Sequence, residues 1–198
     1  AYDKIFRQQL TKLLSRYGEM KEVWFDGSLV FDVGDILSKH APGAVVFQGP
    51  QASIRWVGNE DGVAPYPAWN AVKIGKKPWG LYTAEDGSPE GERWLPNECD
   101  ARMRNTWFWR TDNLQTLKRV DQLMEMYLKS VGRGGVLLLN NTPDPTGLIP
   151  EPDAKRSVEL GAEILRRYGS AVIDTAGTGT NLEMILSAPR KIKCAITM

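Results

Sequence analysis

The sequence predicts an α/β fold, namely the C-terminal half of a (β/α)8-like (TIM) barrel followed by the start of an all-β domain. Strand patterns at 22–26 and 44–49 flank one short helix pattern with short connections, and this βαβ order implies parallel strands. About four β/α units are present, whereas a closed eightfold barrel takes roughly 250 residues. The chain also begins without Met, inside a helix pattern, and ends inside a strand pattern. We therefore expect an internal piece of a longer protein.

The first quarter of the chain predicts a helix, a strand, a helix and a strand. Residues 3–17 have helical spacing of apolar side chains, which are Ile5, Phe6, Leu10, Leu13 and Leu14. Apolar residues from 22 onward predict a short buried strand that ends in Asp26, and Gly27 lets the backbone turn there. A short helix over 31–39 and a strand over 44–49 follow.

Residues 50–105 are rich in Gly, Pro, Asn and charged residues, with little periodicity, so we expect a long functional loop region. Residues 106–110 form a strand-like run. A long helix is expected from Asp112 or Asn113, either of which would cap it, to Leu128. Residues 136–139 predict a fully buried strand, and 153–169 predict the last helix.

The tail, residues 171–198, has a different pattern. Turn signals at 175–181 precede strand-like runs at 182–187 and 191–198. Two short strands are not stable alone. We therefore place a domain boundary after residue 170 and expect an all-β domain to begin there.

Composition excludes several functional classes. The formal net charge is +1, without a long run of one sign, which gives no electrostatic footprint for nucleic acid or an anionic membrane. No apolar stretch approaches the length of a membrane span. His40 is the only histidine, and we place it as a solvated residue at a helix C-terminus, so we expect neither a Ser-His-Asp site nor a His-rich metal site in this chain. Cys99 and Cys194 lack metal-ligand spacing, and no disulfide framework is indicated.

The tryptophans are concentrated in one part of the chain. All seven lie between residues 24 and 109, several of them in polar, Gly/Pro-rich segments. Indole faces pack on the apolar C–H faces of sugars, and the indole N–H can donate to a hydroxyl. This distribution favours a carbohydrate site over a core alone.

Two carboxylates follow strand-like runs at positions where α/β barrels carry their chemistry. Asp26 ends the first strand, and Glu60 follows the strand of 44–49 by a short loop. Strand alternation puts Trp24 on the same face as Asp26 and turns Phe25 toward the helices. Two carboxylates among indoles predict glycoside hydrolysis. The competing interpretation is that each carboxylate only caps a helix or stabilises a loop.

Four motifs in order resemble the α-L-fucosidases of glycoside hydrolase family 29. The segment 13–27, ending Val23-Trp24-Phe25-Asp26-Gly27, resembles the nucleophile motif. The segments 54–60 (Ile-Arg-Trp-Val-Gly-Asn-Glu), 94–100 and 107–109 are similar to the subgroup that prefers branched α-1,3/1,4-fucosyl oligosaccharides. Residues 134–140, with Pro143 and 147–149, resemble the last barrel strand and its loop. The resemblance covers residues 5 to about 170 and continues weakly into the tail as the start of a β-sandwich.

The resemblance implies a retaining exo-α-L-fucosidase with Asp26 as nucleophile and Glu60 as general acid/base. Trp24 and Arg55 would line the fucose pocket, and Trp107 or Trp109 would pack near the sugar's methyl group. Glu98 is the alternative acid/base, because the other subgroup carries that residue in a similar loop. Arg55 has the alternative role of a structural ion-pair partner.

The resemblance further implies a fucosylated oligosaccharide or glycoconjugate as partner, no cofactor or metal, and export from the cytoplasm. Two other functions stay open at this point. A non-catalytic glycan-binding protein on the same scaffold is one, although the presence of both Asp26 and Glu60 argues against it. A retaining glycosidase for another sugar, such as an α-galactosidase, is the other. Oligomeric state cannot be derived from the sequence.

Overall fold

The computed structural model describes residues 1–27, 29–75, 77, 80–169, 181, 183–186 and 188–189. The chain divides into two compact units. The first unit comprises residues 1–102 and 126–140, and the second comprises 103–125 and 141–198. The all-β domain expected over 171–198 falls almost entirely outside the described residues and stays a prediction.

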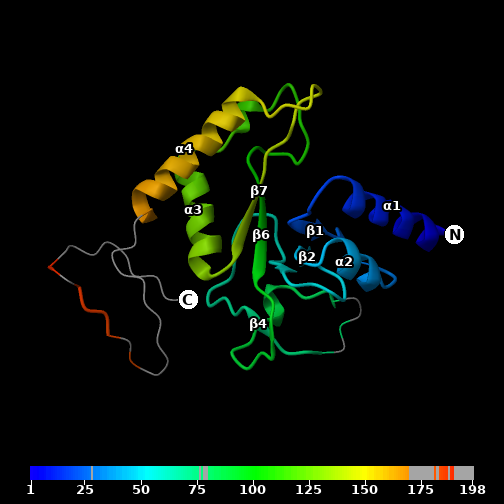
Figure 1. The fold of residues 1–198 in the computed structure, drawn as a ribbon. Coiled ribbons are helices and arrows are strands. Elements are labelled where there is room, and N and C mark those ends of the chain that lie inside the picture. The colour runs from blue at the N-terminus through cyan, green and yellow to red at the C-terminus, as the bar shows by residue number, and fades with distance from the viewer. Residues whose placement is uncertain are drawn as a thin grey trace. The chain divides into compact units, whose positions relative to one another are not determined.

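Parallel strand pairs form the framework of the first unit (Figure 1). β1 and β2 form one pair, and β6 lies between β3 and β7 in another parallel set. The bounds of these strands are β1 Glu22–Trp24, β2 Val45–Phe47, β3 Arg55–Trp56, β6 Asn97–Arg102 and β7 Val136–Asn140. A parallel bridge between Phe47 and Ile54 joins β2 to the start of β3. The parallel strands of the described residues therefore neighbour one another in chain order. This arrangement agrees with the predicted α/β class and with consecutive β/α units.

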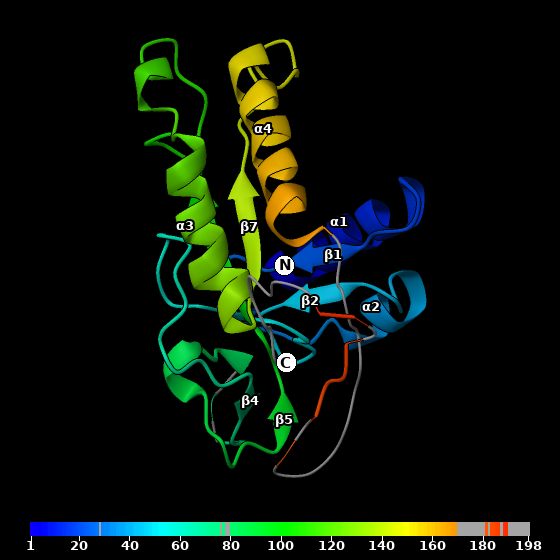
Figure 2. The same cartoon turned by 90° about the vertical axis from the view of Figure 1, so that its left-hand side faces the viewer.

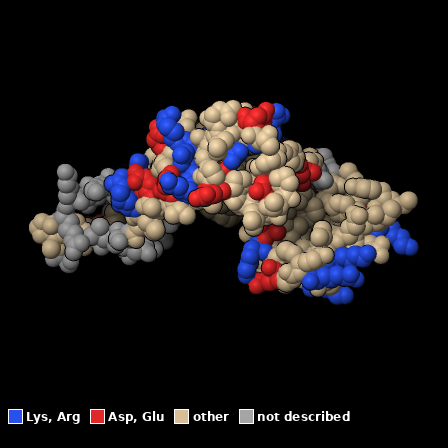
Figure 3. Space-filling model, turned by 90° about the horizontal axis from the view of Figure 1, so that it is seen from above, with Lys and Arg blue, Asp and Glu red and all other residues tan. Residues whose placement is uncertain are grey.

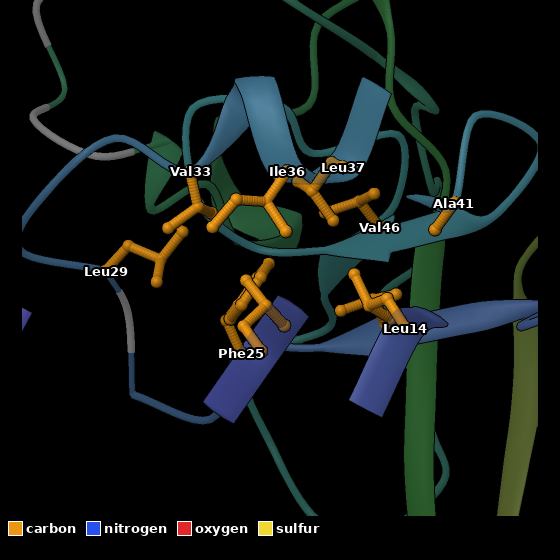
Figure 4. Packing of buried hydrophobic residues seen from close by; sticks show 10 residues of the cluster. Leu14, Phe25, Leu29, Val33, Ile36, Leu37, Ala41 and Val46 are labelled. Atoms are coloured by element: carbon orange, nitrogen blue, oxygen red, sulfur yellow. The ribbon is translucent and has the colours of Figure 1, made fainter. Parts of the chain in front are cut away.

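Two helices cover one side of β1 and β2. The helices are α1 (Tyr2–Arg16) and α2 (Gly34–His40). Leu10 and Leu14 lie one turn apart on α1 and pack into the core of the first unit, which also contains Val23 and Phe25. Figure 4 shows the side chains of α2 meeting Phe25 and Leu14 from the opposite side. In α/β barrels the helices cover the outer side of the strands in this way, and the site lies at the carboxyl ends of the strands.

A small antiparallel pair stands apart from the parallel strands (Figure 2). β4 (Ala71–Val72) pairs with β5 (Arg93–Trp94), with Ala71 opposite Trp94. Val72 and Leu95 are fully buried with Ala52 and Tyr82. The connection between β4 and β5 contains a short 3-10 helix at Ala84–Asp86, which Thr83 begins with a reciprocal cap.

The second unit is stabilised by a buried ion pair. Arg104 donates from Nε to Asp153 Oδ1 at 2.9 Å and from a terminal nitrogen to the other carboxylate oxygen, while Nη1 donates to Asn113 Oδ1 at 2.8 Å. Asp153 lies in the first turn of α4 (Glu151–Tyr168), where a negative charge also interacts favourably with the helix dipole. The fork geometry satisfies a carboxylate and an amide that are both buried.

Several sequence expectations for the middle of the chain are corrected. Residues 50–105, expected to be a long loop region, contain the four strands β3 to β6. No strand forms at the strand-like run of 106–110, because the chain is extended just before this run, as β6. Helix α3 (Val120–Ser130) begins well after Asp112 or Asn113, since Leu114–Thr116 forms a separate 3-10 turn. β7 is only partly buried, with Val136 43% exposed, because it lies at the edge of the β3-β6-β7 set.

Surface charge agrees with the balanced composition. Lys and Arg side chains are interspersed with Asp and Glu side chains over much of the face in Figure 3. Among the described residues, no helix is long and apolar enough to cross a membrane.

Candidate active site

The end of β1 presents Trp24 and Asp26 on one face. Val23 and Phe25 are buried in the core against the helices, whereas Trp24 is 37% exposed and Asp26 is exposed. The predicted alternation is therefore confirmed. Gly27 follows with φ of +76°, a conformation that favours glycine, and turns the chain away directly after the carboxylate.

β6 places two further carboxylates in the interior of the first unit. Glu98 and Asp100 alternate along the strand, so they share one face, and they are 1% and 5% exposed. Cys99 between them points to the other side, where it packs with Val57 and Ala64. Sequence reasoning placed these residues in a loop, although a carboxylate at every second position was a signal for a strand facing a polar site.

Glu98 holds the ring of Trp24. The indole Nε1 of Trp24 donates to Glu98 Oε1 at 2.5 Å, and the ring stacks on Phe47 with centroids 3.8 Å apart. Burial raises the pKa of Glu98 to about 8, a hydrogen bond with the Glu22 side chain raises it further, and the bond from Trp24 opposes the shift. The carboxyl group of Glu98 thus lies in a buried, hydrogen-bonded setting.

Asp100 links the other indole to the catalytic candidates. Trp56 Nε1 donates to Asp100 Oδ1 at 2.7 Å. Burial raises the pKa of Asp100, the bond from Trp56 opposes this, and the like charges of Glu60 and Asp26 add to the increase. Asp26 and Glu60 therefore each lie within electrostatic range of Asp100. We call these three residues and Glu98 the carboxylate cluster.

Glu60 lies on an ordered loop beyond β3. Its side chain is half exposed, and Oε2 is 4.0 Å from Nη1 of Arg102. The preceding Asn59 organises the loop, since its side chain donates to the Val63 carbonyl and accepts from the Asp61 N–H. The side chain of Glu60 is thus accessible from solvent, whereas that of Glu98 is buried.

Arg55 has surroundings that differ from those expected. The residue is fully buried. Its guanidinium donates to the carbonyls of Thr83 (2.8 Å), Asn70 (3.3 Å), Trp69 (2.5 Å) and Leu95. The neighbouring Trp56 bonds to the carboxylate cluster, and strand alternation turns Arg55 to the other side of β3. These contacts are those of a structural residue, as in the alternative role given above. The hydrogen-bond partners of Arg55 are, however, carbonyl oxygens and not the carboxylate that an ion pair requires. A fucose-lining role for Arg55 stays a prediction.

The remaining aromatic candidates lie outside the first unit or outside the described residues. Trp107 and Trp109 are half-buried residues of the second unit, and their place near a sugar methyl group stays a prediction. Trp79 lies outside the described residues. Within the described ranges, no group of three or more His, Cys, Asp or Glu residues has the arrangement of a metal site.

A carboxylate after β1, another in the loop beyond β3 and two within β6, with the indoles of Trp24 and Trp56 bonded to the pair on β6, resemble the kind of site that glycoside hydrolases use. The chain belongs to the alpha-L-fucosidase family, whose model matches residues 1–170. The resemblance inferred from the sequence motifs is therefore confirmed. This family consists of glycoside hydrolases.

Individual relatives agree with the family. Alpha-L-fucosidase 1 of Arabidopsis thaliana is 35% identical over 169 residues, which cover 78% of this chain and 33% of the plant protein. A glycoside hydrolase 29 family member from an unknown rumen bacterium superimposes with a TM-score of 0.76 at 28% identity, over 91% of this chain and 37% of that one.

A Ruminococcus gnavus GH29 fucosidase, solved in complex with fucose, superimposes with a TM-score of 0.73 at 26% identity, over 86% of this chain and 39% of that one. GH29 fucosidases have a TIM-barrel domain, and the chain forms a mixed α/β part of such a fold. The chain spans about a third of the length of the curated relatives it matches.

Proposed function

We propose that the protein carrying this chain is a retaining exo-α-L-fucosidase that removes terminal α-1,3/1,4-linked fucose from branched oligosaccharides or glycoconjugates. The observation that carries the proposal is the carboxylate cluster, in which Asp26 and Glu60 each lie within electrostatic range of the buried Asp100 on β6. Membership of the alpha-L-fucosidase family supplies the sugar. The motif of residues 54–60 supplies the preference for branched substrates.

Retention requires two displacements. Asp26 attacks the anomeric carbon and forms a glycosyl-enzyme ester, while Glu60 donates its proton to the departing glycosidic oxygen. Glu60 then takes a proton from water as that water attacks the anomeric carbon and releases Asp26. We predict a carboxyl separation of about 5–5.5 Å in the substrate-bound site.

The surroundings of the two glutamates support Glu60 over Glu98 as the acid/base. Glu98 is 1% exposed, and its oxygens are engaged by Trp24 and Glu22. A proton donor must reach the glycosidic oxygen. Glu60 is half exposed on its loop and meets that requirement.

The finer fold assignment belongs to the same proposal. Parallel strands in chain order from β1 to β7 support the second half of a (β/α)8-like barrel, and the weak resemblance of residues 171–198 supports the first strands of a β-sandwich. Substrates of this kind occur outside the cytoplasm, so we propose an exported protein.

The decisive experiment uses the full-length protein with a branched Lewis-type fucosyl oligosaccharide and an aryl α-L-fucoside. Fucose release from the branched substrate, abolished in Asp26→Gly and restored by azide with the fucosyl azide of inverted configuration, is the expected result. Cleavage of the aryl fucoside alone would refute the branched preference. An α-galactoside cleaved in its place, or glycan binding without hydrolysis, would overturn the assignment.

Glu60→Ala tests the acid role separately. Loss of activity on the oligosaccharide, with much of the first step retained on an aryl fucoside whose leaving group needs no proton, identifies the acid/base. Glu85→Ala changes an exposed glutamate of the same unit and serves as the control. The same leaving-group dependence in Glu98→Ala in place of Glu60→Ala would transfer the role to Glu98.

A further inference from the structure

Two tryptophans on the β4–β5 pair are exposed although the backbone beneath them is firmly held. Trp69 is 44% exposed and Trp94 is 70% exposed. Most of the Trp94 side chain therefore faces solvent. A single exposed indole is normal, whereas two that share one surface form an apolar patch of the kind that marks an interaction site.

The register of β4 and β5 puts both rings on the same side. Ala71 lies opposite Trp94, and the Leu95 N–H continues the pairing by donating to the Asn70 carbonyl at 2.7 Å. Val72 and Leu95 are fully buried on one side, so alternation turns Ala71 and Trp94 to the other side, together with Trp69. Diagonal neighbours in such a pair are about 7–8 Å apart. Trp69, Ala71 and Trp94 therefore form a surface that we call the indole platform.

Arg55 fixes the backbone under both rings. Its guanidinium donates to the carbonyl of Trp69 itself and to those of Asn70 and Leu95, the residues that follow Trp69 and Trp94. One buried side chain thus ties the two strands that carry the rings. Preorganisation of this kind lowers the entropy cost of binding a ligand on the platform.

The charged groups beside the platform suit a polyhydroxyl ligand. Lys73, two residues after Ala71, is paired with Glu90 at 2.5 Å, and Glu92, two residues before Trp94, has an exposed carboxylate that can accept hydrogen bonds from hydroxyl groups. Ala71 is small, so the exposed parts of the two rings can meet a flat, apolar surface. The C–H faces of pyranose rings have this shape and no charge.

We propose that the indole platform is a carbohydrate-binding surface that stacks against pyranose rings of the glycan outside the fucosyl residue. The choice of ligand class rests on the proposed function. The platform extends that function, because it would recognise sugars that the fucose pocket does not contact. Arg55 acts here as a positioning residue for the platform.

The test uses the full-length protein and lacto-N-tetraose, an oligosaccharide without fucose, with binding measured by titration calorimetry. Trp94→Ala and Trp69→Ala are each expected to raise the Kd about tenfold, which corresponds to about 1.4 kcal/mol. Trp94→Phe, which keeps a flat ring, should recover most of the affinity. Tyr17→Ala removes an aromatic side chain that is 72% exposed on another part of the first unit, and it should leave the Kd unchanged.

Kinetics separate this proposal from the proposed function. In Trp94→Ala, kcat/KM for the branched fucosyl oligosaccharide relative to that for the aryl fucoside should fall about tenfold. Equal loss in Tyr17→Ala, unchanged Kd in both tryptophan variants, or no binding of lacto-N-tetraose by the parent protein would overturn the platform. Hydrolysis of the aryl fucoside reports on the fucosidase assignment alone, so a failure there is recognised independently.

Discussion

Replacing Glu98 by Gln tests whether a carboxyl group is kept protonated in the interior. In the folded chain burial raises the pKa of Glu98 to about 8, with Glu22 contributing through a hydrogen bond, whereas the ordinary value is 4.5. Gln has nearly the same shape, stays neutral at every pH and retains a carbonyl oxygen to accept the bond from Trp24. The substitution therefore removes ionisation and preserves the packing.

The sign of the effect follows from proton binding. Between pH 4.5 and about 8 the folded state holds a proton on Glu98 that the unfolded state has released. The free energy of unfolding must then decrease as the pH rises through this window. A window of about 3.5 pH units corresponds to a loss of order 5 kcal/mol by pH 9, since each unit is worth about 1.4 kcal/mol.

The assay is urea denaturation of the full-length protein at pH 5, 7 and 9, followed by tryptophan fluorescence. Glu98→Gln should have nearly the stability of the parent at pH 5 and exceed it by several kcal/mol at pH 9. Glu92→Gln changes an exposed glutamate of the same unit and should follow the parent at all three values. An equally steep loss of stability in Glu98→Gln and the parent would refute the protonated, buried carboxyl.

Two further predictions concern the interior of each unit. Arg104→Ala should lower the free energy of unfolding by about 3–5 kcal/mol, because the buried carboxylate of Asp153 loses its partner. Arg104→Lys should restore only part of this stability, since an ammonium group lacks the fork geometry of a guanidinium. Denaturation curves with unchanged midpoints would contradict this prediction. Cys99 should stay unlabelled by iodoacetamide at pH 8 in the native protein and become labelled in urea, because burial raises the pKa of its thiol to about 12. Rapid labelling of Cys99 in the native protein, found by peptide mapping, would contradict this prediction.

The sequence was informative wherever burial follows an apolar pattern. Val23 and Phe25 stand out as the buried side of β1, and the Val-Leu-Leu-Leu run located the strand β7, although its predicted full burial was wrong. The face of Trp24 and Asp26 followed from alternation, since period two is a property of every extended strand. These inferences depend only on neighbours along the chain.

β6 was missed because its stabilising partners are distant in sequence. Five of its six residues are buried, yet the segment Asn-Glu-Cys-Asp-Ala-Arg has few apolar side chains. Glu98 bonds to an indole 74 positions away, and Asp100 bonds to one 44 positions away. Burial of polar groups is favourable only when such partners are in place, and no local pattern reveals them. The same reason explains Arg55, whose carbonyl partners leave no trace in side-chain composition.

The hydrogen bonds from Arg55 to the backbone of β4 and β5 have a consequence for substitutions in the indole platform. All four hydrogen bonds from its guanidinium end on main-chain carbonyls, a group that every amino acid supplies. Residues 69 and 94 can therefore be exchanged without loosening the support beneath them. Substitutions there would alter which ligands the protein meets at this surface, while Trp56, the next residue along the same strand, keeps its bond to Asp100. β3 thereby supports an exposed surface through Arg55 and bonds to the carboxylate cluster through Trp56.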